Sequence, residues 1–325
     1  MEPARVDLVI LNWNEREFLE DLILPSVAAQ TYSDFRVIVA DNGSDDDSLA
    51  YLAREWPEVM IVANSRNLGV TAGLNTGIRA ASAEYVALVN NDVELDPAWL
   101  ETLVATMDGH SEAAAAAGKL LTYHDRSVLD GAGDILGEFG LWGRRGHGQV
   151  DRGQYDEPGA IDGISAVAAL YRREAFDVVG LLDEDLYAYF EDSDWSFRAG
   201  LAGYALRYEP AALACHIGGG TNKKRGDFEL FHLQRNAFAL IFKNWTGARI
   251  RAQGWSFLRF QLEELWRSRR DGTMKTRLRG WLAALRLMPA MLRKRRDVFS
   301  RSRPGGTQRH DHPPVRRPGD SFELI

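Results

Sequence analysis

The chain has 325 residues, of which 45% are hydrophobic and 26% charged, so it can form one large domain or two smaller ones with a full core. A single cysteine, Cys215, excludes an intramolecular disulfide and suits a reducing compartment. No uninterrupted apolar run approaches the ~20 residues of a membrane-spanning helix, and the first apolar run is too short for a signal peptide. These features favour a cytoplasmic location.

Charge is divided unevenly along the chain. Residues 243–325 contain 20 Lys and Arg against 7 Asp and Glu, whereas residues 1–242 contain 19 against 39. This segregation predicts an acidic globular domain over residues 1–242 and a basic appendage suited to an anionic surface. Within the appendage we expect amphipathic helices over residues 243–299 and a disordered tail rich in Pro, Arg and Gly over residues 300–325.

Strand-like and helical patterns alternate through the first 90 residues. Apolar runs predict strands, and the segments between them predict helices, one of which is interrupted near Pro25. Such alternation is typical of a parallel sheet with right-handed crossovers. The strands are expected at residues 6–11, 35–40, 59–63 and 85–89, and the helices at residues 15–30, 45–55 and 70–81.

The first strand is not followed by either of the common phosphate loops. A dinucleotide fold needs its glycine fingerprint there, but the chain has Asn12-Trp13-Asn14-Glu15, and a P-loop is also absent. The predicted sheet is therefore expected to bind a nucleotide in another way. Asp41, at the end of the second strand, could accept hydrogen bonds from a ribose or base, or could simply organise the DNGS turn.

The fourth strand leads directly into Asn90-Asn91-Asp92. Ligands of open α/β sheets bind just beyond the carboxyl ends of the strands. A carboxylate there can hold a divalent cation, which in turn can hold a diphosphate. The nearby Asp96 and Pro97 are explained more simply, as the N-cap and first residue of a helix.

A second acidic cluster lies in the later half of the chain. Residues 119–162 are rich in glycine and predict loops and short strands, followed by a strand at 167–171 and a helix at 172–179. Glu191 and Asp192 are expected just before a helix over residues 193–201, where Asp194 could instead pair with Arg198 one turn on. A strand at residues 211–215 then leads to His216 and a triple-glycine loop that a ligand could approach closely.

Six blocks occur in a fixed order: VILNWN, VADNGSDDDS, RNLGVTAGLNTG, LVNNDVELDP, VGLLDEDLYAYFEDSDWSFRAGLAGY and the late His216. At these residues the chain resembles the family-two glycosyltransferases of the GT-A fold, especially bacterial rhamnosyltransferase-like members, over residues 5–240. The resemblance implies an α/β fold with a mostly parallel sheet flanked by helices. It also implies a nucleotide-sugar donor linked to dTDP, UDP or GDP.

The resemblance implies roles for individual residues. Asp192 matches the catalytic base, with Glu191 beside it, and Asp92 matches the acid of the D-x-D motif that holds Mg²⁺ or Mn²⁺, with His216 completing the metal site. Asn90 replaces the first acid of that motif. Acceptor-side positions are expected at Asp194 and Trp195, and nucleotide-sugar contacts at Asn12, Asp41, Arg66, Asn67, Gly69, Asn75, Asn90 and Asn91.

Two apolar stripes with many arginines follow residue 243. They fit helices that lie in a membrane interface, or helices that pack on the preceding domain. No recognised nucleic-acid-binding motif accompanies the basic residues, so we expect no nucleic-acid partner. The stripes contain Trp255, Leu258, Leu262, Leu265 and Trp266, then Leu278, Trp281, Leu282, Leu285, Met288 and Leu292.

Together these features predict an inverting, metal-dependent glycosyltransferase that extends a glycan or a lipid-linked acceptor at the inner face of the cell membrane. A rival hypothesis is a noncatalytic nucleotide-sugar or glycan-binding protein of the same fold, supported by the altered Asn90-Asn91-Asp92. A nucleotidyltransferase is a third alternative, although no glycine-rich phosphate loop lies near the first strand.

Overall fold

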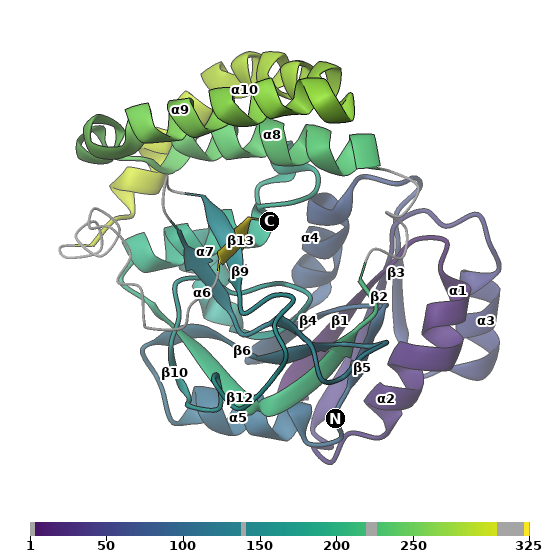
Figure 1. Ribbon diagram of the computed structural model, residues 1–325. Helices are drawn as coiled ribbons and strands as arrows, with labels where there is room; N and C mark the ends of the chain where they lie inside the picture. Colours follow the sequence, from purple (N-terminus) through teal and green to yellow (C-terminus); the bar gives the residue numbers. More distant parts are fainter. Residues whose placement is uncertain (1–3, 138–140, 219–225, 304–321, 325) are drawn as a thin grey trace.

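The computed structural model describes residues 4–137, 141–218, 226–303 and 322–324 (Figure 1). In this part of the chain a ten-stranded sheet runs in the order β10-β12-β6-β11-β4-β1-β2-β3, with β5 paired to β12 and β7 paired to β6. Its strands are β1 (Val6–Asn12), β2 (Phe35–Asp41), β3 (Met60–Ala63), β4 (Tyr85–Asn90), β5 (Val93–Leu95), β6 (Ala113–Thr122), β7 (Leu129–Gly131), β10 (Gly159–Ala160), β11 (Ala168–Arg172) and β12 (Ala205–His216).

The predicted parallel half of the sheet is confirmed. Strands β3, β2, β1 and β4 run parallel to one another. In this register Asn12 pairs with Asp41, and Leu11 pairs with Asn90. The carboxyl ends of these strands therefore meet at one edge of the sheet, where the polar residues of three loops come together.

The other half of the sheet is mixed. Strand β11 is antiparallel to both β4 and β6, whereas β12 is parallel to β6. The strand expected at 211–215 is longer than predicted and has an irregularity between Glu209 and Leu213. The helix expected from residue 193 begins at Glu191, so Glu191 and Asp192 form its first turn instead of preceding it.

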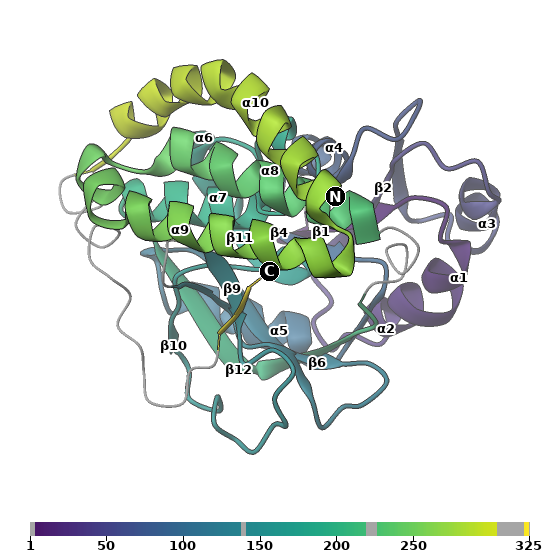
Figure 2. The same cartoon turned by 45° about the horizontal axis from the view of Figure 1, so that its top comes forward.

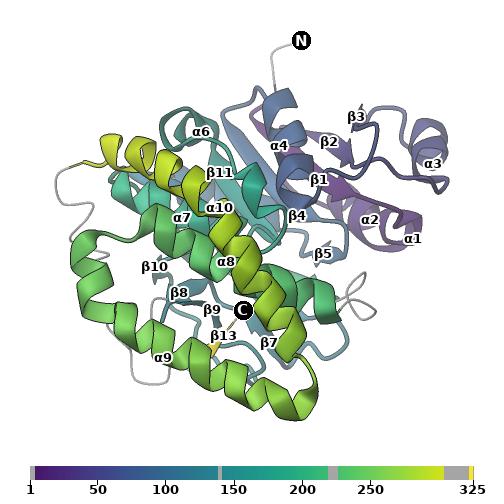
Figure 3. The ribbon, with the colours of Figure 1, turned by 90° about the horizontal axis from the view of Figure 1, so that it is seen from above.

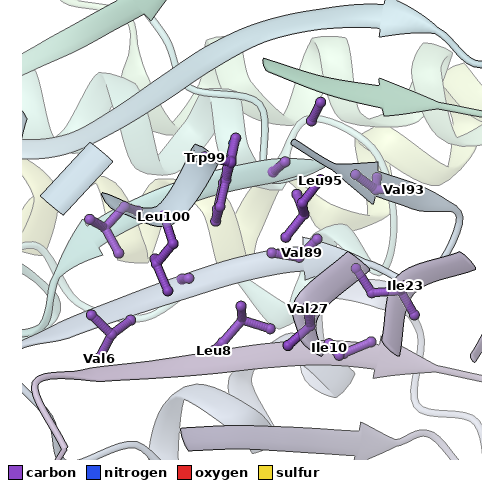
Figure 4. Packing of buried hydrophobic residues seen from close by; sticks show 14 of the residues in the cluster. Val6, Leu8, Ile10, Ile23, Val27, Val89, Val93, Leu95, Trp99 and Leu100 are labelled. Atoms are coloured by element: carbon purple, nitrogen blue, oxygen red, sulfur yellow. The ribbon is translucent and has the colours of Figure 1, made fainter. Parts of the chain in front are cut away.

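Helices cover both faces of the sheet. The helices are α1 (Arg16–Phe18), η1 (Leu19–Ile23), α2 (Leu24–Ala28), α3 (Ser48–Glu55), α4 (Val70–Ala80), α5 (Trp99–Asp108), α6 (Arg173–Val179), η3 (Glu184–Leu186) and α7 (Glu191–Leu201). The predicted break near Pro25 is a π-helical turn, η1, immediately before α2. Leu8 and Ile10 of β1 pack in a core with Ile23, Val27 and Leu100 from helices on one face (Figure 4).

Three long helices form a further layer: α8 (Gly226–Asn244), α9 (Gly247–Asp271) and α10 (Met274–Ser300) (Figure 1). They lie in front of the sheet in Figure 2, and α10 crosses over α8 in Figure 3. Met291 and Val298 of α10 share a core with Leu240 of α8 and Phe197 of α7. The boundary predicted at residue 242 thus falls inside α8, which packs against the acidic domain.

A small second sheet contains β8 (Asp134–Leu136), β9 (Trp142–Arg145) and β13 (Phe322–Leu324). Strand β13 pairs antiparallel with β9, so these last described residues do not fit the disordered tail expected for residues 300–325. Residues 304–321 and 325 of that tail lie outside the described part of the chain.

Candidate functional site

A cavity of about 320 Å³ opens at the carboxyl ends of β1 and β4, within the size range of small-molecule sites. Its wall combines loops after the parallel strands with the first turn of α7, the end of β12 and the start of α8. Eight of the residues selected from the sequence line it: Asn67, Gly69, Asn90, Asn91, Asp92, Glu191, Asp192 and His216.

Strand pairing brings Asp92 and His216 together across 124 residues of sequence. Strand β5 pairs with β12 so that His216 lies opposite Val93, and the amide of Ile217 donates to the carbonyl of Asp92 over 3.0 Å. As a result, Nε2 of His216 lies 3.3 Å from Oδ2 of Asp92. These two side chains, predicted to share a metal site, therefore face each other at the edge of the cavity.

Asp130 is a partner of His216 that sequence reasoning missed. Its Oδ2 lies 2.9 Å from Nδ1 of His216, and its Oδ1 accepts from Arg144 over 2.9 Å. Burial disfavours the charged ring of His216, but hydrogen bonds with Asp130 and Asp92 outweigh burial and raise its pKa to about 9. A carboxylate that holds Nδ1 fixes the ring so that Nε2 faces Asp92, as in many metal-binding histidines.

The donor atoms at this edge fit a divalent cation. The described residues contain no cluster of three or more His, Cys, Asp or Glu arranged to hold a metal ion, and the pair Asp92 and His216 offers two candidate ligands. A cation held by one or two side chains together with substrate phosphates is the usual arrangement for Mg²⁺. Nε2 must lose its proton before it can ligate.

The first turn of α7 places Glu191 and Asp192 at the cavity in different environments. Asp192 accepts hydrogen bonds from the amides of Ser193 (2.7 Å) and Ala166 (3.3 Å). Burial raises its pKa, and these two amides oppose the rise. Glu191 is buried, its Oε2 has no hydrogen-bond partner among the described residues, and burial followed by the charge of Asp192 raises its pKa to about 8.

Asp134 is a further carboxyl group in the cavity, and the sequence did not single it out. It is 2% exposed, and its Oδ2 has no partner in the described part of the chain. Burial and the charge of Asp192 raise its pKa to about 8. Asp134 and Asp130 lie in the segment DGAGD, within the stretch predicted as glycine-rich loops. The two aspartates separated by glycines were the one sequence pattern that could have identified them as site residues.

The segment that leads into α7 has an unusual backbone. Tyr187, Tyr189 and Phe190 all have φ between 65° and 69°, a region that costs non-glycine residues energy and is concentrated at functional sites. The buried amide of Asn236 on α8 donates to the carbonyls of residues 186, 188 and 189. Asn236 is a further residue that the sequence did not reveal.

Gly69, just before α4, lies against the segment that leads into α7. Its φ is +89°, and a Cβ at this position would lie 2.6 Å from the ring of Tyr187. The amide of Thr71 donates to the carbonyl of Tyr187 over 3.1 Å. The glycine is therefore required for close approach between the start of α4 and the segment before α7.

Asn12 and Asp41 lie behind the cavity wall. Both are fully buried, and the amide of Asn12 donates to Asp41 over 3.1 Å. The other contacts of Asp41 are with Gly43 and Ser44, which is the turn role that the sequence left open. Asn91 donates to Asn12 over 3.2 Å, so this pair supports a residue of the cavity wall.

Four other predicted residues do not line the cavity. Arg66 is exposed, and Asn75 is buried against Leu182 and Glu184. Asp194, expected on the acceptor side, is fully buried and pairs with Arg198 over 2.8 Å, which confirms the structural alternative.

Trp195, the other residue expected on the acceptor side, is also fully buried. Its indole donates to the carbonyl of Gly180 over 3.0 Å and packs beside Tyr171 and Phe176. Both side chains expected on the acceptor side are therefore part of the core around α7.

Two curated proteins are similar to this chain in sequence. The chain is 28% identical over 214 residues to poly-beta-1,6-N-acetyl-D-glucosamine synthase of Staphylococcus aureus, a match that covers 65% of this chain and 50% of that protein. It is 30% identical over 217 residues to N-acetylglucosaminyl-diphospho-decaprenol L-rhamnosyltransferase of Mycobacterium tuberculosis, a match that covers 59% of this chain and 70% of that protein. The chain thus spans about half the length of the first of these relatives.

Solved structures share the fold at low sequence identity. The mannosyltransferase PcManGT from Pyrobaculum calidifontis in complex with GDP-Man and Mn²⁺ superposes with a TM-score of 0.56 at 15% identity, over 91% of this chain and 85% of that one. GalNAc-T7 with UDP, GalNAc and Mn²⁺ superposes with a TM-score of 0.55 at 18% identity, over 66% of this chain and 44% of that one. These neighbours identify the fold as GT-A. The model of glycosyl transferase family 2 matches residues 7–180, more than half of the chain, and the protein belongs to that family.

Proposed function

We propose that the protein is an inverting glycosyltransferase that moves a sugar from a nucleotide-diphosphate donor to a hydroxyl of a glycan or lipid-linked acceptor. The relative from M. tuberculosis is a rhamnosyltransferase with a decaprenol-linked acceptor, which supports a rhamnosyl donor and cell-surface polysaccharide synthesis. The neighbours solved with UDP or GDP-Man support a nucleotide-sugar donor, linked to dTDP, UDP or GDP.

In this proposal the cavity holds the donor between the strand ends and the segment before α7. Asn67, Gly69, Asn90 and Asn91 contact the nucleotide sugar, whereas Asn12 and Asp41 act by supporting the wall. Asp92 and His216 would hold Mg²⁺ or Mn²⁺, which when bound neutralises charge that develops on the diphosphate.

Asp192 is the proposed catalytic base. As the acceptor oxygen bonds to the anomeric carbon, Asp192 takes the proton from that hydroxyl, and the bond between the sugar and the diphosphate breaks. A single displacement of this kind inverts the anomeric configuration. Glu191, beside Asp192, would orient acceptor hydroxyls.

One observation supports Asp192 over its neighbours. Glu191 and Asp134 each have a buried carboxyl oxygen without a partner among the described residues, and each has a pKa raised to about 8, so both favour the protonated form at neutral pH. Burial also raises the pKa of Asp192, but two backbone hydrogen bonds favour its ionised form, and its charge adds to the rise in the pKa of both neighbours. Environments that separate the pKa values of neighbouring acids indicate which one acts as the base.

The test compares Asp192→Asn with Glu191→Gln. General-base catalysis contributes about 10²–10⁴-fold, so turnover should fall by that factor in Asp192→Asn while the donor Kd changes little. Glu191→Gln should mainly raise the acceptor KM. Near-normal turnover in Asp192→Asn with an inactive Glu191→Gln would move the base to Glu191. Donor binding without hydrolysis or transfer by the wild type, across a broad acceptor panel, would favour a noncatalytic sugar-binding protein.

We also propose that the protein acts at the cytoplasmic face of the cell membrane. The decaprenol-linked acceptor named for the relative from M. tuberculosis supports this location, because such an acceptor is held in a bilayer. Fractionation of cells that express the full chain, with the donor-hydrolysing activity followed in cytosol and membranes, tests the location. Activity found entirely in the cytosol at low salt would contradict it.

A further inference from the structure

The outer face of α9 exposes large apolar side chains. Trp255 is 72% exposed and Trp266 58%, and Leu258 and Leu262 lie between them at intervals of three or four residues, on one side of the helix. The side that packs inward is formed by other residues: Phe257, Gln261 and Ser268 are buried. The apolar stripe predicted from the sequence is therefore not the packing face of this helix.

Helix α10 repeats the arrangement. Its packed side contains Gly280, Ala284, Met291 and Val298, and its exposed side contains Leu278, Leu282, Leu285 and Leu292. A Cβ at Gly280 would lie 2.8 Å from Cβ of Gln234 on α8, so the two helices are in close contact. If α10 rotated to turn its exposed leucines inward, their side chains would not fit into this close contact between the two helices.

The same surfaces are strongly basic. The exposed charged residues of α9 and α10 include three acids, Glu263, Asp271 and Asp297, and ten basic residues: Arg251, Arg259, Arg267, Arg269, Arg270, Lys275, Arg279, Arg286, Arg293 and Arg296. The guanidinium of Arg270 lies 5.5 Å from the ring centroid of Trp266, so charge and apolar area are interleaved. Long basic side chains can extend to headgroups while leucine and tryptophan contact the acyl chains.

We propose that the outer face of α9 and α10, formed by these exposed leucine, tryptophan, arginine and lysine side chains, docks on an anionic lipid bilayer. No helix in the described part of the chain is long and apolar enough to cross a membrane, so the helices would lie in the interface. Basic residues near an anionic surface strengthen such binding. A second copy of the chain is disfavoured, because two such faces would bring their excess positive charges together.

The docking face is connected to the proposed active site through α8. Phe228 and Glu229, in the first turn of α8, line the cavity, and α10 packs along α8. The biological role of this docking rests on the proposed function, because a lipid-linked acceptor would be met by a docked enzyme at the bilayer surface. Its test measures binding and does not require activity.

The experiment floats the full chain with phosphatidylcholine vesicles that contain or lack phosphatidylglycerol. The wild type should bind the anionic vesicles at low salt and dissociate as salt rises. The double variant Trp255→Ser/Trp266→Ser should bind about tenfold more weakly or worse, and Arg279→Gln and Arg286→Gln about fivefold more weakly each. All four positions are exposed, so the variants should fold.

Matched controls lie on the acidic domain. Met60 on β3 is 43% exposed and Arg54 on α3 is largely exposed, so Met60→Ser and Arg54→Gln change similar side chains away from the proposed face. They should bind like the wild type. Absence of wild-type binding at low salt would overturn the inference, as would tryptophan variants that bind as well as Met60→Ser. A wild-type dimer that the tryptophan substitutions convert to a monomer would assign the face to a second copy instead.

Donor turnover with a short, water-soluble acceptor separates this inference from the proposed function. Tryptophan variants that lose vesicle binding but keep this turnover support the docking face. A wild type that binds vesicles but shows no turnover rejects the proposed function and leaves the docking face in place.

Discussion

Asn236 is expected to control turnover although it does not line the cavity. Its buried side-chain amide donates to the carbonyls of Leu186, Ala188 and Tyr189 over 3.0, 2.8 and 2.7 Å. At about 0.5–1.5 kcal/mol for each net hydrogen bond, these contacts contribute roughly 1.5–4.5 kcal/mol. They hold a segment that ends where Glu191 and Asp192 begin.

The same segment stores backbone strain. Tyr187, Tyr189 and Phe190 have positive φ values, which cost about 1–3 kcal/mol each and roughly 3–9 kcal/mol together. Because the strain is at least comparable to the hydrogen bonds of Asn236, the segment should relax in Asn236→Ala. Relaxation would move Asp192, and a displacement of about 1 Å at a reacting group can cost about 100-fold in rate.

The assay is steady-state transfer with separate measurement of donor Kd and of urea unfolding. Asn236→Ala should lower kcat about 100-fold with a smaller change in donor Kd, since Asp92 and His216 are on other elements. Gln234→Ala is the matched control: Gln234 lies on the same helix and accepts from Trp281 over 3.0 Å, so it should lose stability but keep kcat. Equal kcat in the two variants would refute the reasoning.

Three further predictions concern the metal pair, the core and the glycine beside the active-site segment. Asp92→Ala should abolish Mn²⁺-dependent donor binding in a thermal-shift assay. The control Glu94→Ala removes a nearby carboxylate that pairs with Arg126, and it should keep this binding. Equal loss of binding in both variants would remove Asp92 from the site. Burial alone would raise the pKa of Asp194, but the charges of Arg198 and then Lys243 hold it well below its usual range. Its stabilising effect is therefore complete above the unfolded pKa near 4 and is lost as pH falls toward the folded value. Asp194→Asn should cost about 3–5 kcal/mol in urea unfolding at pH 7 and less at pH 3, and a pH-independent difference would contradict this. Gly69→Ala should lower kcat and stability together, because its Cβ would lie 2.6 Å from a tyrosine ring; unchanged unfolding would show that the ring can move aside.

Local patterns were sufficient for the parallel half of the sheet. Each strand there is a largely apolar run bounded by polar turns, interrupted by Asp7 in β1 and Arg36 in β2. The chain also alternates strand and helix at regular spacing, so the topology follows from the sequence. Asn90 and Asp92 could be placed at the ligand edge for the same reason, because the carboxyl ends of adjacent parallel strands share one edge.

Strand β6 shows where local patterns fail. It begins with five buried alanines, residues 113–117, and alanine has the highest helix propensity of any residue. The segment is a strand because β6 pairs with β11 on one edge and with β12 on the other. The approach of β12 is close at Gly118, where a Cβ would lie 1.7 Å from the carbonyl oxygen of Ala212. Packing from distant segments overrides local propensity at this position.

The sequence by itself determined the family, the parallel sheet and the residues that flank its ligand edge, because each depends on neighbours within about ten positions or on a motif read in order. Only the tertiary structure decided which acids share the cavity. Asp130 reaches His216 across 86 residues, Asp134 joins Asp192 from a glycine-rich stretch, and Asn236 fixes the segment before α7 from a helix far along the chain. Contacts of this kind have no local signature, since the distance between two side chains depends on how the whole chain packs.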